Sequence, residues 1–317
     1  MAARRCIACD ASGPFPVLFE RFGYTVVRCD CGLAFQDPQP SADVLADSYY
    51  QDEGFARALL GELRETTLDS ARRKLELLRD AGAWRPGIRV LDVGASSGAW
   101  LEVGAAAGAD AVGVELGEST AAAARDRGLD VRTGTLAGVL DGLAGERFDL
   151  ITFWDVLEHL PDPRHELELS RSLLAPGGRV AATYPNVDGL YPTLTYRLLA
   201  RRTGIWEHPE LPVHLFDLSP RSSRLLLERQ GYDIERIRTF AIPFEHLRTT
   251  VLAPGRTGAG WRGRTLRAAF AAIHLAAYPV AKITDRGNAM FVLARAAEVQ
   301  RGRWQRGDAG SGEARLG

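Results

Sequence analysis

The sequence predicts an α/β fold in which a mostly parallel sheet carries helices on both faces. Between residues 85 and 185, short apolar strand segments alternate with helical segments, as in repeated βαβ units. The first strand, around Val90, runs through a glycine-containing turn directly into a helix-like run at residues 99–107. A chain of 317 residues with 46% hydrophobic residues can form one such domain and further appendages.

The turn after the first strand is predicted to bind a ligand. Its spacing is Asp92-x-Gly94-x-x-x-Gly98, with Ala95 and Ser96 inside the turn, and it differs from the Gly-x-Gly-x-x-Gly turn of dinucleotide folds. Glycine tolerates positive φ and lets a ligand approach the backbone where a Cβ would block it. The helix that follows points its unpaired N–H groups toward the same space.

This turn resembles motif I of the class I S-adenosylmethionine (SAM)-dependent methyltransferases. The next strand ends at Glu115, where that family places the carboxylate that binds both ribose hydroxyls. Further segments resemble the fourth strand with its loop, the turn into the fifth strand and the exit from it: 148–163, 173–179 and 184–186. The resemblance covers about residues 85 to 240 and implies a Rossmann-like, seven-stranded sheet with SAM as cofactor.

Carried over position by position, the resemblance implies a set of SAM-binding residues. The middle glycine of the family's motif is replaced here, but Ala95 and Ser96 are small enough to admit the methionine part of SAM. The implied set is Asp92, Gly94, Ala95, Ser96, Gly98, Glu115, Leu116, Thr135, Trp154 and Asp155. The alternative is a doubly wound fold that binds another nucleotide or no ligand.

All four cysteines lie near the N-terminus, as Cys6-x-x-Cys9 and Cys29-x-Cys31. Two close pairs of this kind are typical of a structural zinc ribbon, in which four thiolates fill a tetrahedral site. Residues 28–38 also resemble the zinc module fused ahead of a methyltransferase group that includes sugar C-methyltransferases. In that group the second pair is usually Cys-x-x-Cys, whereas one residue separates it here. The alternative is four free structural thiols.

Asp155, Glu158 and His159 stand at positions i, i+3 and i+4, so one helical turn would project all three to one side. They follow the fourth predicted strand, at the sheet edge where open α/β folds bind ligands. They resemble the acid-x-x-Glu-His trio with which ubiquinone-biosynthesis O-methyltransferases hold Mg²⁺ near the substrate hydroxyl. Two alternatives are that His159 is a general base, or that Glu158 and His159 only brace the loop.

Residues 186–220 interrupt the strand–helix pattern with an aromatic, proline-containing insertion. His214 to Ser219 resembles the His-x-x-x-x-Ser segment that lines the acceptor pocket in these methyltransferases, which makes His214 a second candidate base. A surface histidine is the alternative, and His208 lies in the same loop. Five aromatic residues are candidates for the pocket wall or for the core: Trp154, Tyr184, Tyr191, Tyr196 and Trp206.

The predicted domains are a zinc-ribbon-like module at 1–40, a helical connector at 41–84, a methyltransferase domain at 85–298 with an inserted helix at 261–282, and a disordered tail at 299–317. Ser41 is the expected N-cap of the connector, and its apolar positions repeat at helical spacing. The helix at 261–282 is basic and amphipathic, which favours a lid or dimer face over peripheral membrane contact.

The composition limits the classes of binding partner and the cellular location that we expect. A net charge of -1 argues against a nucleic-acid partner. We expect no secretory signal at residues 1–10, and the apolar stretch 268–281 is shorter than the ~20 residues of a membrane span. The expected location is the cytoplasm, with reduced cysteines.

Together these features predict a SAM-dependent methyltransferase that acts on an oxygen or carbon nucleophile of a small-molecule acceptor, such as a sugar or a hydroxylated secondary metabolite. An RNA methyltransferase with a zinc module and a catalytically inactive binding module are the alternatives. The acceptor, the methylated atom and the oligomeric state stay open at this point.

Overall fold

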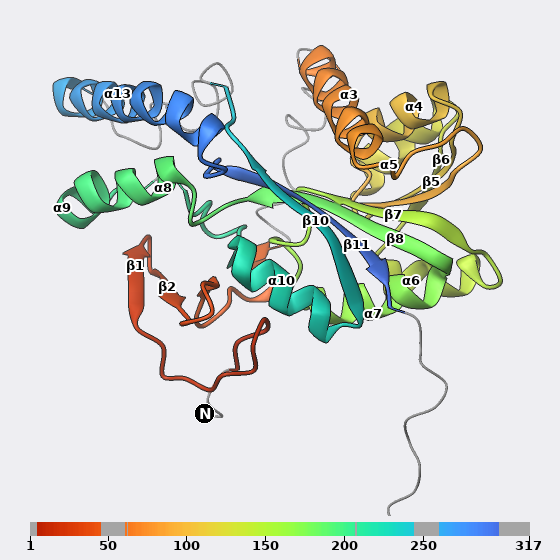
Figure 1. Cartoon of the computed structure of the whole chain (residues 1–317), viewed down its shortest axis with the longest axis horizontal. Helices are drawn as coiled ribbons and strands as arrows, with labels where there is room; N and C mark the ends of the chain where they lie inside the picture. Colours follow the sequence, from red (N-terminus) through yellow and green to blue (C-terminus); the bar gives the residue numbers. More distant parts are fainter. Residues whose placement is uncertain (1–4, 46–60, 62, 207, 244–259, 298–317) are drawn as a thin grey trace, which may run out of the picture.

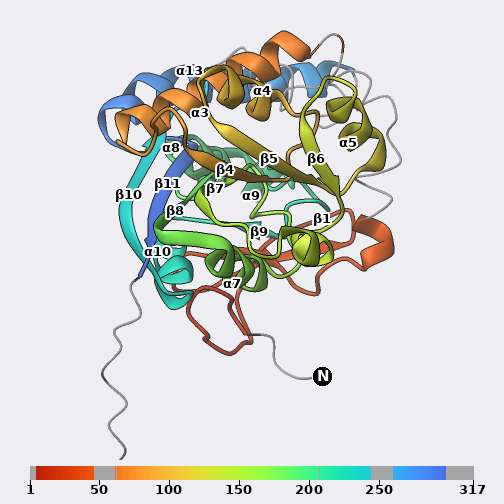
Figure 2. The ribbon, with the colours of Figure 1, turned by 90° about the vertical axis from the view of Figure 1, so that its right-hand side faces the viewer.

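The computed structural model describes residues 5–45, 61, 63–206, 208–243 and 260–297. Its larger sheet has seven strands in the order β10-β11-β8-β7-β4-β5-β6, which Figure 2 shows from one end. The five strands from β8 to β6 are parallel, and β11 runs antiparallel to β8 and β10. In spatial order the strands are β10 (Tyr232–Phe240), β11 (Ala289–Ala296), β8 (Leu174–Pro185), β7 (Phe148–Trp154), β4 (Arg89–Val93), β5 (Asp110–Glu115) and β6 (Asp130–Thr133). The predicted α/β class is therefore confirmed.

Helices cover both faces of this sheet (Figure 1). One face carries α3 (Arg64–Asp80), α4 (Ala99–Ala106) and α5 (Glu118–Arg125). The other carries α6 (Leu136–Val139), α7 (Pro163–Leu173) and α10 (Pro220–Arg229), and a short 3₁₀ turn spans Leu140–Leu143. Parallel strands need covering on both faces, and the two layers of buried apolar side chains supply it.

Within the predicted connector, the structure describes helix at residues 42–45 and in α3. Ser41 Oγ accepts a hydrogen bond from the Val44 N–H at 3.4 Å, as expected of an N-cap. The apolar repeat of α3 is buried against α4 and the sheet through Leu68, Ala71, Leu75 and Leu78. Residues 46–60 and 62 of the connector, and the predicted tail at 299–317, lie outside the described residues.

The N-terminal module is a smaller sheet of β1 (Val17–Arg21), β2 (Tyr24–Arg28), β3 (Ala34–Gln36) and β9 (Phe216–Asp217). Its fourth strand, β9, comes from the insertion after β8, so a strand 180 residues later in the chain completes the module. The Gln36 side-chain amide also donates to two carbonyl oxygens of that insertion, Pro212 O at 2.8 Å and His214 O at 2.6 Å. The module is thus hydrogen-bonded to the segment that carries His214.

The insertion continues β8 into α8 (Leu190–Thr195), a π-helical turn at Tyr196–Ala200 and α9 (Arg201–Thr203). The added helix α13 (Gly260–Ile283) packs on α8 through Tyr191, Ile273 and Ala277 (Figure 1). Among the described residues, α13 is the one helix whose length and composition would suit a membrane span. With 24 residues, α13 is longer than the apolar stretch 268–281, which was expected to be too short for a membrane span.

Asp92 is a buried carboxyl at the centre of the larger sheet. Its exposed fraction is 2%, and its Oδ1 accepts a hydrogen bond from Thr152 Oγ1 at 2.6 Å. Burial raises the pKa of Asp92 to about 7, although the Thr152 hydrogen bond acts in the opposite direction. The folded protein therefore keeps a proton on Asp92 at pH values where the unfolded chain has lost it.

We predict that Asp92 makes the free energy of unfolding fall as the pH rises from about 4 to about 7. The folded pKa lies above the unfolded one, so the stabilisation is complete below the unfolded pKa and is lost as the pH rises through the folded pKa. Asp92→Asn should remove this slope, whereas Asp130→Asn, an exposed control on β6, should keep it. Urea unfolding across this pH range measures both, and identical slopes for wild type and D92N would contradict the assignment.

Candidate functional site

The turn between β4 and α4 requires glycine at two positions. Gly94 and Gly98 both have φ of 78°, a backbone conformation that other residues rarely adopt. A Cβ would lie 2.5 Å from Val156 Cγ2 at Gly94 and 2.5 Å from Leu129 Cδ1 at Gly98. Conformation and packing therefore both exclude a side chain, and the turn opens α4 at the carboxyl edge of the sheet.

Glu115 connects the first two βα turns at this edge. Its Oε2 accepts a hydrogen bond from the Ser96 N–H, and its Oε1 accepts one from the Gly117 N–H, both at 2.7 Å. These bonds hold the half-buried carboxylate in one orientation. A carboxylate accepts about four hydrogen bonds, so two ribose hydroxyls can still donate to it.

The remaining residues implied as SAM ligands have different environments. Ala95 is buried beneath the turn, and Leu116 is 46% exposed beside Glu115. Thr135 caps α6, because its Oγ1 accepts a hydrogen bond from the Gly138 N–H at 3.0 Å. The Thr135 hydroxyl therefore has a local structural role that the sequence-based assignment did not include.

Trp154 belongs to the core rather than to a pocket wall. Its ring centroid lies 5.1 Å from that of Trp100 in an edge-on contact and 6.5 Å from that of Phe291 in a stacked one. Tyr184 and Tyr191 are also buried, in the core and against α13 respectively. Of the five candidate aromatic residues, Tyr196 and Trp206 line a cavity.

Asp155 does not share a helical face with Glu158 and His159, contrary to the sequence-based expectation. Its φ is 59°, so the chain turns sharply at the end of β7 and no helix begins there. Its carboxylate accepts hydrogen bonds from Lys74 Nζ at 2.9 Å and Thr183 Oγ1 at 3.0 Å. Lys74 was not identified from the sequence; its signal was its rarity, as one of two lysines in an arginine-rich chain.

The structure instead brings Glu158 and His159 together with His214. One nitrogen or oxygen atom of each lies within 4.8 Å of the others, and the two imidazole centroids are 4.7 Å apart. The backbone produces this approach, because the Leu215 N–H donates to Glu158 O at 2.8 Å. Glu158 is 1% exposed, and its Oε2 has no hydrogen-bond partner among the described residues.

Asp217 extends this cluster and was not identified from the sequence. Its Oδ1 lies 3.5 Å from His208 Nε2 and 3.9 Å from His214 Nδ1, and its exposed fraction is 2%. Glu210 Oε2 lies 3.6 Å from His214 Nε2 on the other side of the ring. An acid three residues after a candidate histidine was the available sequence signal. We call Glu158, His159, His208, His214 and Asp217 the histidine cluster.

Burial and charge give the members of the histidine cluster different proton affinities. Burial lowers the pKa of His159 and of His208 to about 4. Burial acts the same way on His214, but Asp217 and Glu158 outweigh it and raise the pKa of His214 above its ordinary value. Burial also raises the pKa of Glu158 to about 8. At neutral pH, His159 is therefore a neutral imidazole.

The hydrogen bonding of His159 fixes its tautomer. Its Nδ1 lies 3.0 Å from Val213 O, and a carbonyl oxygen only accepts hydrogen bonds. The proton of the neutral ring is therefore assigned to Nδ1, and the basic lone pair to Nε2. This is the form in which a histidine can accept a proton from a substrate.

The four cysteines converge at one point of the N-terminal module. The Sγ atoms of Cys6 and Cys31 are 3.5 Å apart, as are those of Cys9 and Cys29, and all four lie within 4.8 Å of one another. Tetrahedral zinc with Zn–S bonds of ~2.3 Å requires sulfurs ~3.8 Å apart. The four thiols therefore have the chemistry and the spacing of a structural zinc site.

Comparisons with known proteins agree with this architecture. Residues 62–237 match the family model described as a methyltransferase domain. The ubiquinone biosynthesis O-methyltransferase of Ruegeria pomeroyi is 31% identical over 187 residues, which are 54% of this chain and 75% of that protein. The enzyme of the same name from Bordetella avium is 34% identical over 147 residues, 43% of this chain and 61% of that protein.

Solved structures share the fold at low sequence identity. A SAM-dependent methyltransferase from Archaeoglobus fulgidus superposes with a TM-score of 0.51 at 19% identity, covering 77% of this chain and all of the other. A second match is the magnesium protoporphyrin IX methyltransferase of Synechocystis, solved with bound S-adenosylhomocysteine. Its TM-score is 0.50 at 16% identity, and the superposition covers 80% of this chain and all of the other. With the family match over more than half of the chain, these findings show that the protein belongs to the class I SAM-dependent methyltransferases.

Proposed function

We propose that this methyltransferase methylates a nucleophile, preferentially a hydroxyl, of a small-molecule acceptor, and that His159 takes the proton. The neutral, half-buried imidazole of His159, with Nδ1 held by Val213 O, carries this proposal. The names of the relatives support oxygen as the methylated atom. A carbon nucleophile on a sugar or another secondary metabolite is the second possibility, suggested by the cysteine module.

SAM supplies an electrophilic methyl group when it is bound, and the residues around the β4–α4 turn fit it. Helix α4 begins directly after the turn and points its first N–H groups toward the carboxyl edge of the sheet, and Ala95 and Ser96 leave room for the methionine part. Glu115 offers its remaining lone pairs to the ribose. Lys74 neutralises the carboxylate of Asp155 at the end of β7.

The histidine cluster supplies what the acceptor requires. His159 Nε2 removes the hydroxyl proton as the oxygen attacks the methyl group, and the carboxylates of Asp217 and Glu210 lie around the neighbouring His214 ring. Glu158, His214 and Asp217 are buried, which keeps water from this side of the cluster and strengthens these interactions. Most of the rate acceleration then comes from holding two reactants in line in a dry site.

A Mg²⁺-dependent reaction fits the cluster less well. Mg²⁺ prefers oxygen ligands, whereas the three side chains that approach one another are one carboxyl and two imidazoles. The acid that would complete an oxygen-rich set, Asp155, is already paired with Lys74. We therefore favour His159 as a base over a magnesium ligand.

We also propose that Cys6, Cys9, Cys29 and Cys31 hold one structural zinc ion per chain, in a reducing compartment such as the cytoplasm. Four thiolates leave no open position, so the ion would stabilise the module and take no part in methyl transfer. The module is small and three of its cysteines are buried, so the ion would replace part of a hydrophobic core.

The first prediction from this proposed function concerns cofactor affinity. Replacing Glu115 with alanine should weaken SAM binding by on the order of 2–4 kcal/mol, since charge-assisted hydrogen bonds to the ribose are lost. Glu118→Ala removes an exposed carboxylate from the adjacent helix and should leave the affinity unchanged. Titration calorimetry with SAM measures both. An unchanged affinity in E115A would remove Glu115 from the site.

The second prediction concerns proton transfer. His159→Gln should lower methyl transfer from radiolabelled SAM to the best of a panel of hydroxylated acceptors by about 10²–10⁴-fold, with SAM affinity nearly unchanged. His165→Gln, an exposed histidine on α7, is the matched control. NMR of the imidazole nitrogens should find His159 neutral at pH 6, because its pKa is about 4.

Two results would contradict this role for His159. One is full activity in H159Q. The other is activity that disappears with EDTA and returns with Mg²⁺, which would make Glu158 and His159 metal ligands rather than a base site.

The third prediction concerns zinc. Elemental analysis of protein purified without added metal should find about one zinc per chain, and Cys9→Ser should lower that content. Four freely titrating thiols in metal-free, folded protein would show that the cysteines are only structural.

A further inference from the structure

A cavity of about 490 Å³ lies between the N-terminal module and the segment that follows β8. Its walls include Leu18 and Arg28 from the module, Asp188 from the exit of β8, and Arg286 from the turn after α13. A cavity of this volume suits one small molecule. It is formed only because the module and the methyltransferase domain are joined.

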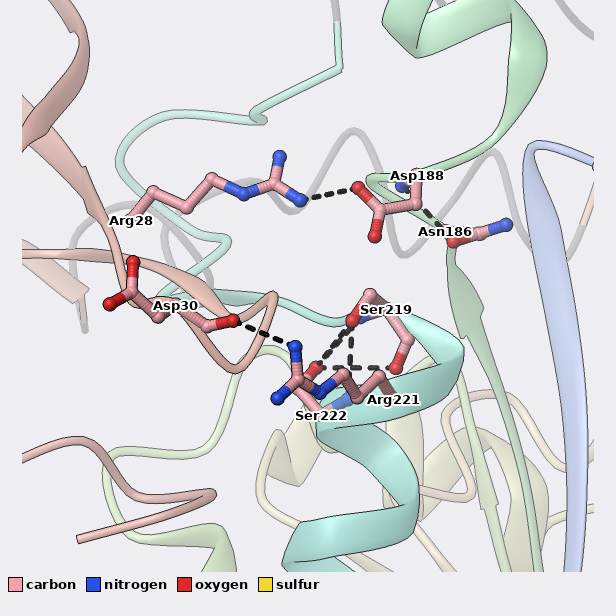
Figure 3. Close-up of polar contacts among 7 residues, drawn as sticks. All are labelled: Arg28, Asp30, Asn186, Asp188, Ser219, Arg221 and Ser222. Carbon is pink, nitrogen blue, oxygen red and sulfur yellow. Dashed lines mark hydrogen bonds and ion pairs between the residues drawn. The ribbon is translucent and has the colours of Figure 1, made fainter. Parts of the chain in front are cut away.

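Positive charge dominates the cavity wall. Arg28, Arg197 and Arg286 line it against one acid, Asp188, which pairs with Arg28 across the cavity wall (Figure 3). Among the described residues, the side chains of Arg197 and Arg286 form no ion pair with a carboxylate. Three positive charges against one negative charge give a formal charge of +2, in a protein whose net charge is -1. Guanidinium groups match phosphate oxygens in geometry as well as charge.

Figure 3 also shows how the Arg28–Asp188 pair is held. The Asp188 N–H donates to Asn186 Oδ1 at 3.1 Å, which fixes the chain at the exit of β8. On the module side, Arg221 donates to Asp30 O at 3.1 Å and ties α10 to the segment after β2. Hydrogen bonds therefore hold both chain segments beside this cavity, the exit of β8 and the segment after β2.

Two aromatic rings form the apolar part of the same cavity. Tyr196 and Trp206 have ring centroids 5.0 Å apart, with planes inclined by 53°. Their polar ends are occupied, because Tyr196 OH donates to Leu18 O at 3.0 Å and Trp206 Nε1 donates to Pro192 O at 3.1 Å. The rings are thus fixed, and because Trp206 is 3% exposed, the half-buried Tyr196 presents more of the apolar surface on which a planar or sugar ring can pack.

The cavity adjoins the histidine cluster. The Trp206 ring centroid lies 5.4 Å from that of His208, and His208 Nε2 lies 3.5 Å from Asp217 Oδ1. Trp206 therefore contacts the His208 end of the histidine cluster, and Asp217 and His214 continue the cluster from His208 toward His159.

We propose that this cavity binds the phosphate-bearing part of the acceptor, with Arg28, Arg197 and Arg286 around the phosphate and a ring of the acceptor against Tyr196 and Trp206. The substrate class is then a phosphorylated, ring-containing small molecule. This inference rests on the proposed function, since the methyl-accepting atom of the same molecule must reach His159. It gives the N-terminal module a part in acceptor binding.

Uridine 5′-diphosphate is a suitable probe, because it carries phosphate and a ring but lacks the adenine that the SAM site would accept. Calorimetry on the full-length protein saturated with S-adenosylhomocysteine should show saturable binding. The double variant Arg197→Gln/Arg286→Gln should raise the dissociation constant at least about tenfold. The control double variant Arg201→Gln/Arg264→Gln removes two charges at exposed positions on α9 and α13 outside the cavity, and should change it less than about twofold.

Three outcomes would overturn the proposal: no saturable binding of uridine diphosphate, an equal loss in both double variants, or tighter binding of a short oligouridylate, which would indicate RNA. Titration of the same samples with S-adenosylhomocysteine distinguishes a failure of the cavity assignment from a failure of the proposed function. If S-adenosylhomocysteine binds and the diphosphate does not, the cavity assignment alone fails; if S-adenosylhomocysteine does not bind, the proposed function fails.

Discussion

The pairing of β3 with β9 is the contact on which the geometry of the candidate acceptor site depends. Ala34 and Phe35 of the module pair with Asp217 and Phe216, and the Gln36 amide holds two carbonyl oxygens of the same segment. A buried amide that donates twice is costly to leave unpaired, so these bonds restrict the segment strongly. The N-terminal module thereby determines where the His214 side of the histidine cluster lies.

The other half of the cluster is placed by the methyltransferase fold itself. β7 ends at Trp154, the positive φ of Asp155 redirects the chain, and Glu158 O then accepts the N–H groups of Leu215 and Phe216. Two segments more than 50 residues apart thus meet through backbone hydrogen bonds. Desolvation lowers the pKa of His159, whereas Asp217 and Glu158 outweigh desolvation at His214 and raise its pKa.

Local patterns were sufficient to predict the methyltransferase fold and its SAM cofactor. The glycine spacing after β4, the acid at the end of β5 and the alternation of strands and helices each depend on neighbouring residues. The two cysteine pairs also predicted that the four thiols lie together, because metal ligands recur at short spacing. The helix at 261–282 followed from its amphipathic pattern and agrees with α13 within two residues.

The acceptor half depends on contacts that no local pattern records. The i, i+3, i+4 spacing grouped Asp155 with Glu158 and His159, but the left-handed backbone conformation of Asp155 itself breaks the helical spacing. Lys74 reaches Asp155 from a helix 81 residues earlier in the chain, and β9 joins a sheet whose other strands lie at the N-terminus. Such pairings are set by the packing of the whole chain, so the roles of Lys74 and Asp217 required the structure.

The central claim is that the histidine cluster faces the reactive end of the cofactor. A crystal structure with S-adenosylhomocysteine tests it most directly, through the distance from the cofactor sulfur to His159 Nε2. With the ribose on Glu115, this distance should be less than about 8 Å, which leaves room for a methyl group and an acceptor hydroxyl between them. A sulfur well beyond that distance, or one that points away from the loop after β7, would contradict His159 as the base.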